Sequence, residues 1–170
     1  MTVRYRLFAL SLSCSAVVLT ACAKSPAMTA VPVAAASSTQ AHVTAPLPPV
    51  LVHKSPTCGC CGLWVEHLRR AGFVVQVDDR DDVNPVKQRL GVPYGKGSCH
   101  TAEVGGYFIE GHVPVEDIKR LLAERPDAKG LVLPGMPAGS PGMELPDGTT
   151  QPYTVELIGR DGETRPFARH

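Results

Sequence analysis

The residues best suited to chemistry are Cys58, Cys60 and Cys61, which crowd into four consecutive positions, and Cys99, which lies further along the chain. Thiolate sulfur is both the nucleophile of thiol–disulfide exchange and a soft metal ligand. Cys58 and Cys61 have the Cys-x-x-Cys spacing of dithiol oxidoreductases. A helix is predicted directly after them, and the positive end of its dipole favours the thiolate form. The cysteines therefore indicate a metal site or a redox pair.

Structural disulfides explain this pattern poorly, although exported proteins often use cysteines in that way. A core of about 100 residues is large enough to fold without cross-links. Adjacent cysteines such as Cys60 and Cys61 would also be strained partners. We therefore expect the four cysteines to serve chemistry.

Cys60 favours a metal site, because a third thiol beside a redox pair would trap mixed disulfides. Soft sulfur ligands select Cu(I), Zn or iron–sulfur clusters, and zinc sites usually draw two cysteines from each of two separate turns. Adjacent ligands such as Cys60 and Cys61 point in different directions, which suits bridging thiolates in a multinuclear site. Four thiolates with four Cu(I) ions also sum to zero charge, which is cheaper to bury. We therefore expect a multinuclear Cu(I) site on Cys58, Cys60, Cys61 and Cys99.

The alternative is a thiol–disulfide oxidoreductase that uses Cys58 and Cys61, with metal binding incidental. The sequence leaves open whether a copper site would buffer, transfer or oxidise the metal, and hence whether the protein is an enzyme. His100 adjoins Cys99 and is a further candidate, as a ligand or as a group that supports a ligand. Weaker candidates of the same kind are His112, Met136 and Met143.

Residues 1–21 have the pattern of an export signal. Arg4 and Arg6 precede an apolar run that is too short to be a confident membrane span. The run ends in Leu-Thr-Ala-Cys, which resembles the lipobox of bacterial lipoproteins, so we expect cleavage before Cys22 and acylation of that cysteine. A plain cleaved signal or an uncleaved anchor is the alternative. Both place the following domain in the bacterial cell envelope, on the periplasmic side. Under the lipobox interpretation, lipid on Cys22 would anchor the protein to the membrane.

The composition of the rest of the chain separates a tether from a domain. Residues 22–49 consist largely of Ala, Pro, Ser, Thr and Val, and such a segment cannot offset the entropy of ordering. Residues 50–170 then form one domain. Across the chain 17 basic residues face 16 acidic ones and aromatic residues make up 5%, which argues against a nucleic-acid partner.

Within the domain, strands and helices are expected to alternate. Apolar runs predict strands at 50–53, 73–77, 102–104 and 107–110, and a terminal hairpin at 153–158 and 164–169. Apolar stripes and end signals predict helices at 63–71, from the cap Asn84 to Gly91, and from Pro114 to Arg125. The first two strands should be parallel, because a helix joins them. This β-α-β-α-β-β-α order predicts an α/β, thioredoxin-like core, followed by a Gly/Pro/Met-rich loop at 133–146 and the hairpin.

Several segments together resemble the CopG-type proteins of bacterial copper-resistance clusters. These segments are Lys54–Trp64, Ser98–Ala102, Val104–Tyr107, Glu110–Pro114 and Leu133–Pro137. The resemblance covers residues 50–144 and implies a thioredoxin-like fold, an envelope location and a multinuclear copper site on the four cysteines. It also implies a role in copper resistance or Cu(I)/Cu(II) handling, beside copper efflux or envelope copper-carrier proteins. Many such proteins carry a simple signal, so the lipobox departs from the family pattern.

Overall fold

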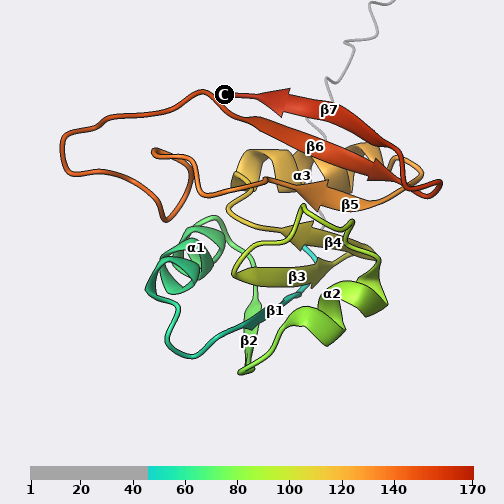
Figure 1. The fold of residues 1–170 in the computed structure, drawn as a ribbon, viewed down its shortest axis with the longest axis horizontal. Coiled ribbons are helices and arrows are strands. Elements are labelled where there is room, and N and C mark those ends of the chain that lie inside the picture. Colours follow the sequence, from blue (N-terminus) through green and yellow to red (C-terminus); the bar gives the residue numbers. More distant parts are fainter. Residues whose placement is uncertain (1–45) are drawn as a thin grey trace, which may run out of the picture. The chain divides into compact units, whose positions relative to one another are not determined.

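The computed structural model describes residues 46–170, which form three helices and seven strands (Figure 1). The predicted signal, Cys22 and most of the predicted tether lie outside the described residues. In chain order the elements are β1 (Val50–Lys54), α1 (Gly59–Arg70), β2 (Val75–Asp79), α2 (Asn84–Leu90), β3 (His100–Val104), β4 (Tyr107–Glu110), α3 (Val115–Glu124), β5 (Ala128–Val132), β6 (Thr154–Gly159) and β7 (Thr164–Arg169).

All seven strands belong to one mixed sheet with the order β2-β1-β3-β4-β5-β6-β7. The predicted parallel pairing of the first two strands is confirmed, with Val50 beside Val75. Strand β1 also pairs antiparallel with β3, and β3 with β4, around the predicted Gly105–Gly106 turn. The terminal hairpin extends the same sheet, because β5 pairs parallel with β4 and antiparallel with β6. The described domain is therefore a mixed α/β fold.

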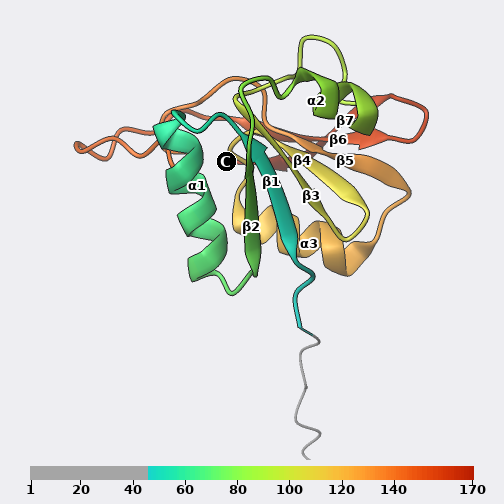
Figure 2. The same cartoon turned by 90° about the horizontal axis from the view of Figure 1, so that it is seen from below.

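The helices cover both faces of the sheet, as Figures 1 and 2 show, with α1 and α3 on one face and α2 on the other. Alternate strand residues explain this division, because neighbours such as Phe108 and Ile109 point to opposite faces. Ile109 belongs to the main core with α1 and α3, whereas Phe108 packs in a smaller cluster with Leu90 and Val92. Within the described residues no helix is long and apolar enough to span a bilayer.

The structure differs from the prediction in one added strand and in the bounds of several elements; β3, for example, begins at His100 and not at Ala102. Strand β5 was not predicted, because Lys129 and Gly130 interrupt a short apolar run; at Gly130 any side chain would collide with the main chain of Phe108. Helix α1 begins at Gly59, before the predicted position 63, and β2 begins at Val75. Asn84 is not the cap of α2: it is the first helical residue, and its main-chain N–H donates to Asp82 Oδ1.

Candidate metal and thiol site

Three of the four cysteines lie at the start of α1. Cys58 is the N-cap residue, with an extended main chain and no side-chain capping hydrogen bond, while Cys60 and Cys61 follow in the first helical turn. Cys61 is fully buried, and the other two are partly exposed. The first turn carries no acidic residue, so that negative charge on the sulfurs faces no like charge there. One helix start thus presents three sulfurs in different directions.

The register of the sheet brings Cys99 to the same place. His100, the first residue of β3, lies opposite Lys54, the last residue of β1, in the antiparallel pair. Cys99 directly precedes β3, and the turn with the other cysteines directly follows β1. The end of β1 and the start of β3 lie side by side, so that the two segments meet at the same end of these strands. The sulfurs of Cys58, Cys60, Cys61 and Cys99 all lie within 4.8 Å of one another. Two sequence segments that are far apart therefore form one cluster of four sulfurs.

The cluster contains one disulfide bond, which joins Cys58 to Cys61. Cys60 and Cys99 are free thiols, and Cys60 Sγ lies 3.5 Å from Cys58 Sγ. The sequence predicted no structural disulfide. This bond closes a loop with a sequence separation of only 3, so that it restricts the unfolded chain very little. Cys58 and Cys61 are also the two cysteines of the oxidoreductase alternative. All four thiolates become available for a metal only after this disulfide is reduced by two electrons.

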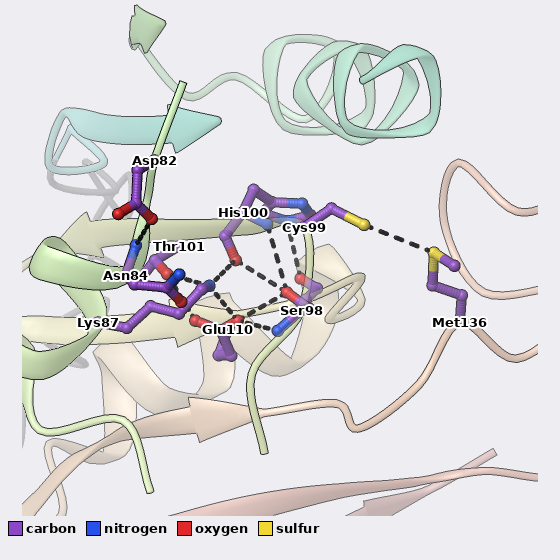
Figure 3. Close-up of polar contacts among 10 residues, drawn as sticks. Asp82, Asn84, Lys87, Ser98, Cys99, His100, Thr101, Glu110 and Met136 are labelled. Carbon is purple, nitrogen blue, oxygen red and sulfur yellow. Dashed lines mark hydrogen bonds and ion pairs between the residues drawn. The ribbon is translucent and has the colours of Figure 1, made fainter. Parts of the chain in front are cut away.

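Cys99 has a distinctive environment within the cluster. Its Sγ lies 3.8 Å from Met136 Sδ, which reaches over from the Gly/Pro/Met-rich loop (Figure 3). Burial raises the pKa of the Cys99 thiol, the neighbouring Cys60 raises this pKa further, and Lys87 partly offsets the effect. A metal that binds Cys99 must therefore displace a proton.

Two buried histidines stand beside the cluster. His100 Nε2 donates to Gly111 O at 3.0 Å, and His112 Nδ1 donates to Pro141 O at 2.8 Å. Among the described residues, the other ring nitrogens, His100 Nδ1 and His112 Nε2, have no hydrogen-bond partner. Burial lowers the pKa of His100 to about 3 and also lowers the pKa of His112. Each ring is therefore neutral with one free lone pair, the form that binds metals.

His100 and His112 also belong to a packed ring cluster. Their ring centroids are 5.1 Å apart, and the His100 ring lies 4.4 Å from the ring of Trp64. Trp64 is fully buried, and its Nε1 donates to Val113 O at 2.9 Å. Among residues 46–170, the compact group of possible metal ligands contains the four cysteines and neither histidine.

The loop after β5 packs against the start of α1. Gly142 has a φ of +83°, and a Cβ there would lie 2.9 Å from both Cys60 O and Trp64 N, so only glycine fits this close approach. Glu144 accepts a hydrogen bond from Gly142 N at 2.9 Å and pairs with His67 of α1 at 2.7 Å. Of the two candidate methionines, Met136 is the one in contact with a cysteine.

Sequence reasoning missed two charged residues behind Cys99. Lys87 of α2 and Glu110 at the end of β4 form a buried ion pair, with 2.6 Å between Nζ and Oε1 (Figure 3). A single lysine on a helix and a single glutamate at a strand end are normally exposed, so that their residue types gave no signal. The apolar residues Phe108 and Ile109 indicated a buried strand, but they gave no sign that Glu110, the last residue of this strand, is buried too.

Comparison with known proteins places this arrangement in a family. The sequence model of a family described as a protein of unknown function, DUF411, matches residues 96–143. Two solved structures, described as forms 1 and 2 of copper resistance protein CopG, are each 45% identical to this chain. Each covers 73% of this chain and 98% of its own, with TM-scores of 0.68 for form 1 and 0.69 for form 2. No curated protein matches the chain.

Proposed function

Because this chain belongs to the CopG-type family of copper resistance proteins, we propose that it binds Cu(I) through its four clustered cysteines. The observation that carries the proposal is the approach of the four sulfurs to within 4.8 Å of one another. Sulfur-only donor sets suit Cu(I), and the solved relatives are described as copper resistance proteins. The protein therefore acts in copper resistance, by holding or converting the metal.

We propose further that the site is multinuclear. Cys60 and Cys61 are neighbours in the helix and cannot both turn toward one ion as easily as they can bridge several. Four thiolates around one Cu(I) leave three excess negative charges, and the buried cation behind Cys99, Lys87, is already paired with Glu110. Four Cu(I) ions cancel the thiolate charge without help from the protein.

A thioredoxin-like core is part of the same proposal. Strands β2-β1-β3-β4, with the first pair parallel and the next two antiparallel, support this interpretation, as does the cysteine turn at the start of α1. Strands β5 to β7 and the loop after β5 are then an extension, which carries Met136 to the cluster.

A second candidate function is thiol–disulfide exchange by Cys58 and Cys61. The disulfide between them favours it, because this pair has the spacing and the position of a redox motif. Reduction of the bond consumes two electrons and two protons and yields two thiols. The same reduction must precede binding of copper by all four sulfurs, so that one redox step would control the other activity.

Anaerobic Cu(I) titration of the reduced protein tests the main proposal. The full chain with Cys14→Ser and Cys22→Ser contains only the four clustered cysteines, since the sequence has six in all. We expect the metal content, measured by mass spectrometry, to reach a plateau well above one copper per chain. Equal copper binding by a further variant with all four clustered cysteines replaced by serine would overturn the proposal.

Cys60→Ser separates the two candidate functions. As an exchange enzyme, the protein would keep most of its insulin-disulfide reduction, because Cys58 and Cys61 remain. As a copper cluster, it would lose most of its copper and not one quarter, because the ligands of a cluster act jointly. Cys99→Ser is expected to behave in the same way. Full copper stoichiometry in both variants, with insulin reduction abolished by Cys58→Ser, would favour the enzyme.

We also propose that the protein is exported and anchored in the cell envelope by lipid on Cys22, where copper efflux or copper-carrier proteins could exchange metal with it. The support is the apolar run that ends at Cys22. Cys22→Ser is expected to release the protein from membranes, because lipid is the proposed attachment. If the variant still sediments with membranes at high salt, the anchor proposal is wrong.

A further inference from the structure

The segment that carries Cys99 rests on a buried ion pair. Lys87 and Glu110 come from different elements, α2 and β4, and their side chains are 10% and 0% exposed. Burial of two charges is costly unless each is paired and hydrogen-bonded. Both conditions are met, because every bond that these two side chains make leads to the other or to the chain around Cys99 (Figure 3).

Glu110 binds the residues on both sides of Cys99. Its Oε1 accepts hydrogen bonds from the main-chain N–H of Ser98 and from Ser98 Oγ, the latter at 2.7 Å. Its Oε2 accepts from Thr101 Oγ1 at 2.6 Å. One carboxylate therefore fixes both the main chain before Cys99 and the start of the strand after it.

Lys87 binds the same segment from the side of α2. Its Nζ donates to Thr101 Oγ1 at 2.7 Å and to His100 O at 3.4 Å, besides its bond to Glu110. Ser98 Oγ also lies 2.9 Å from His100 O, which closes the ring of contacts around Cys99.

The other side of the segment is closed by Gly111. A Cβ on this glycine would lie 2.6 Å from Leu133 O and 3.4 Å from Ser98 Cβ, so that Ser98 packs directly on the main chain. The side chain of Cys99 lies 3.8 Å from Met136 Sδ and beside the thiol of Cys60, and neither contact ties it to the sheet. The place of its Sγ therefore depends on how the main chain is held at Ser98 and His100.

We propose that Lys87 and Glu110 are positioning residues that hold Cys99 Sγ at bridging distance from the three sulfurs of α1. The inference rests on the proposed copper function. Well-packed apolar residues could replace a buried ion pair without loss of stability, but they could not bind the N–H of Ser98 and two hydroxyl groups. The charged pair therefore provides placement of the loop, which apolar packing would not provide.

Two variants of the full chain, with Cys14→Ser and Cys22→Ser, test this role. The double substitution Lys87→Met/Glu110→Met removes both charges and the carboxylate that binds Ser98 and Thr101, so that no charge is left buried and unpaired. Ser98→Ala keeps the ion pair and removes one of its links to the Cys99 segment. Asp117→Asn is the control, since it neutralises another buried carboxylate, in α3, which pairs with His170 at 2.8 Å.

The first readout is geometric and needs no copper. In protein with the Cys58–Cys61 disulfide, diamide takes two electrons and two protons from Cys60 and Cys99 and joins their sulfurs. We expect the double variant to form this cross-link about tenfold more slowly than the parent, and Ser98→Ala about threefold more slowly. The control Asp117→Asn leaves the contacts of Lys87 and Glu110 in place and is expected to keep the parent rate.

The second readout is copper. The reduced double variant is expected to bind as little copper as the Cys99→Ser variant. In the double variant, the alkylation rate of Cys99 is expected to be about the same with and without copper. Parent rates of cross-linking, with parent copper content, in both variants would overturn the inference. If the double variant fails to fold, Ser98→Ala decides alone. Slow cross-linking in a protein whose parent binds no copper would keep the positioning role and refute the copper function.

Discussion

The two halves of the sulfur cluster are positioned by different means. The turn with Cys58, Cys60 and Cys61 is positioned by the start of α1 and by its own disulfide: its N-cap makes no side-chain capping hydrogen bond, and no charged residue lies in its first turn. Cys99, a single residue before a strand, is surrounded by a buried ion pair and four further hydrogen-bonded groups. The difference teaches that neighbours in sequence share one main chain, whereas an isolated ligand must be fixed by contacts from elsewhere.

The largest difference between the two halves is expected when the carboxylate of the buried ion pair is removed. Glu110→Ala leaves Lys87 buried without its partner, and we expect the free energy of unfolding to fall by about 3–5 kcal/mol. In α1 the pair Arg69–Glu66 is exposed, so that Glu66→Ala should change it by less than about 1 kcal/mol. Urea unfolding of both variants measures these values. Similar small losses in the two variants would mean that the Cys99 segment does not depend on the ion pair.

The pH dependence of stability tests the Cys99 side of the cluster through its neighbour His100. Burial lowers the pKa of His100 from 6.5 to about 3. Between these values the unfolded chain binds a proton at His100 and the folded chain does not, so stability falls as the pH falls. The contribution of His100 reaches about 1.4 kcal/mol per pH unit. Urea unfolding of metal-free protein between pH 6.5 and 4.5 should therefore show a smaller slope for His100→Asn; equal slopes would contradict the prediction.

The smallest expected effect lies in the cysteine turn. Gly62 is inside α1, and a Cβ at this position would meet nothing within 4 Å. Gly62→Ala should therefore stabilise the protein by about 0.5–1 kcal/mol, because alanine loses less entropy in a helix. Thermal unfolding measures the change. A clear loss of stability would show that the turn, like the Cys99 segment, depends on contacts that helix geometry does not supply.

Local patterns predicted much of the fold. The parallel pair β1 and β2, the hairpin at Gly105–Gly106 and the terminal hairpin all follow from apolar runs and turn residues, and the structure contains each of them. Strand β5 escaped prediction because its glycine is required by Phe108, a residue from another strand. Its place beside β4 is a tertiary fact, which no local pattern expresses.

The candidate site shows the same division. The crowding of Cys58, Cys60 and Cys61 is visible in the sequence, and the structure brings Cys99 to them through the register of β1 and β3. The burial of Lys87 and Glu110 depends on the packing of α2 against β3 and β4, and isolated charged residues give no sign of it. Nor did the Cys-x-x-Cys spacing alone decide between a dithiol and a disulfide.

Trp64 gives the protein a built-in optical signal. It is the sole tryptophan of the chain, its indole is sealed from water, and its ring lies 4.4 Å from His100. An indole in such a dry and rigid setting emits at short wavelength, and its emission is sensitive to nearby metal ions. Any change in indole emission therefore comes from one known side chain, in the same helix as Cys60 and Cys61, without a dye and without interference from a second emitter of its kind.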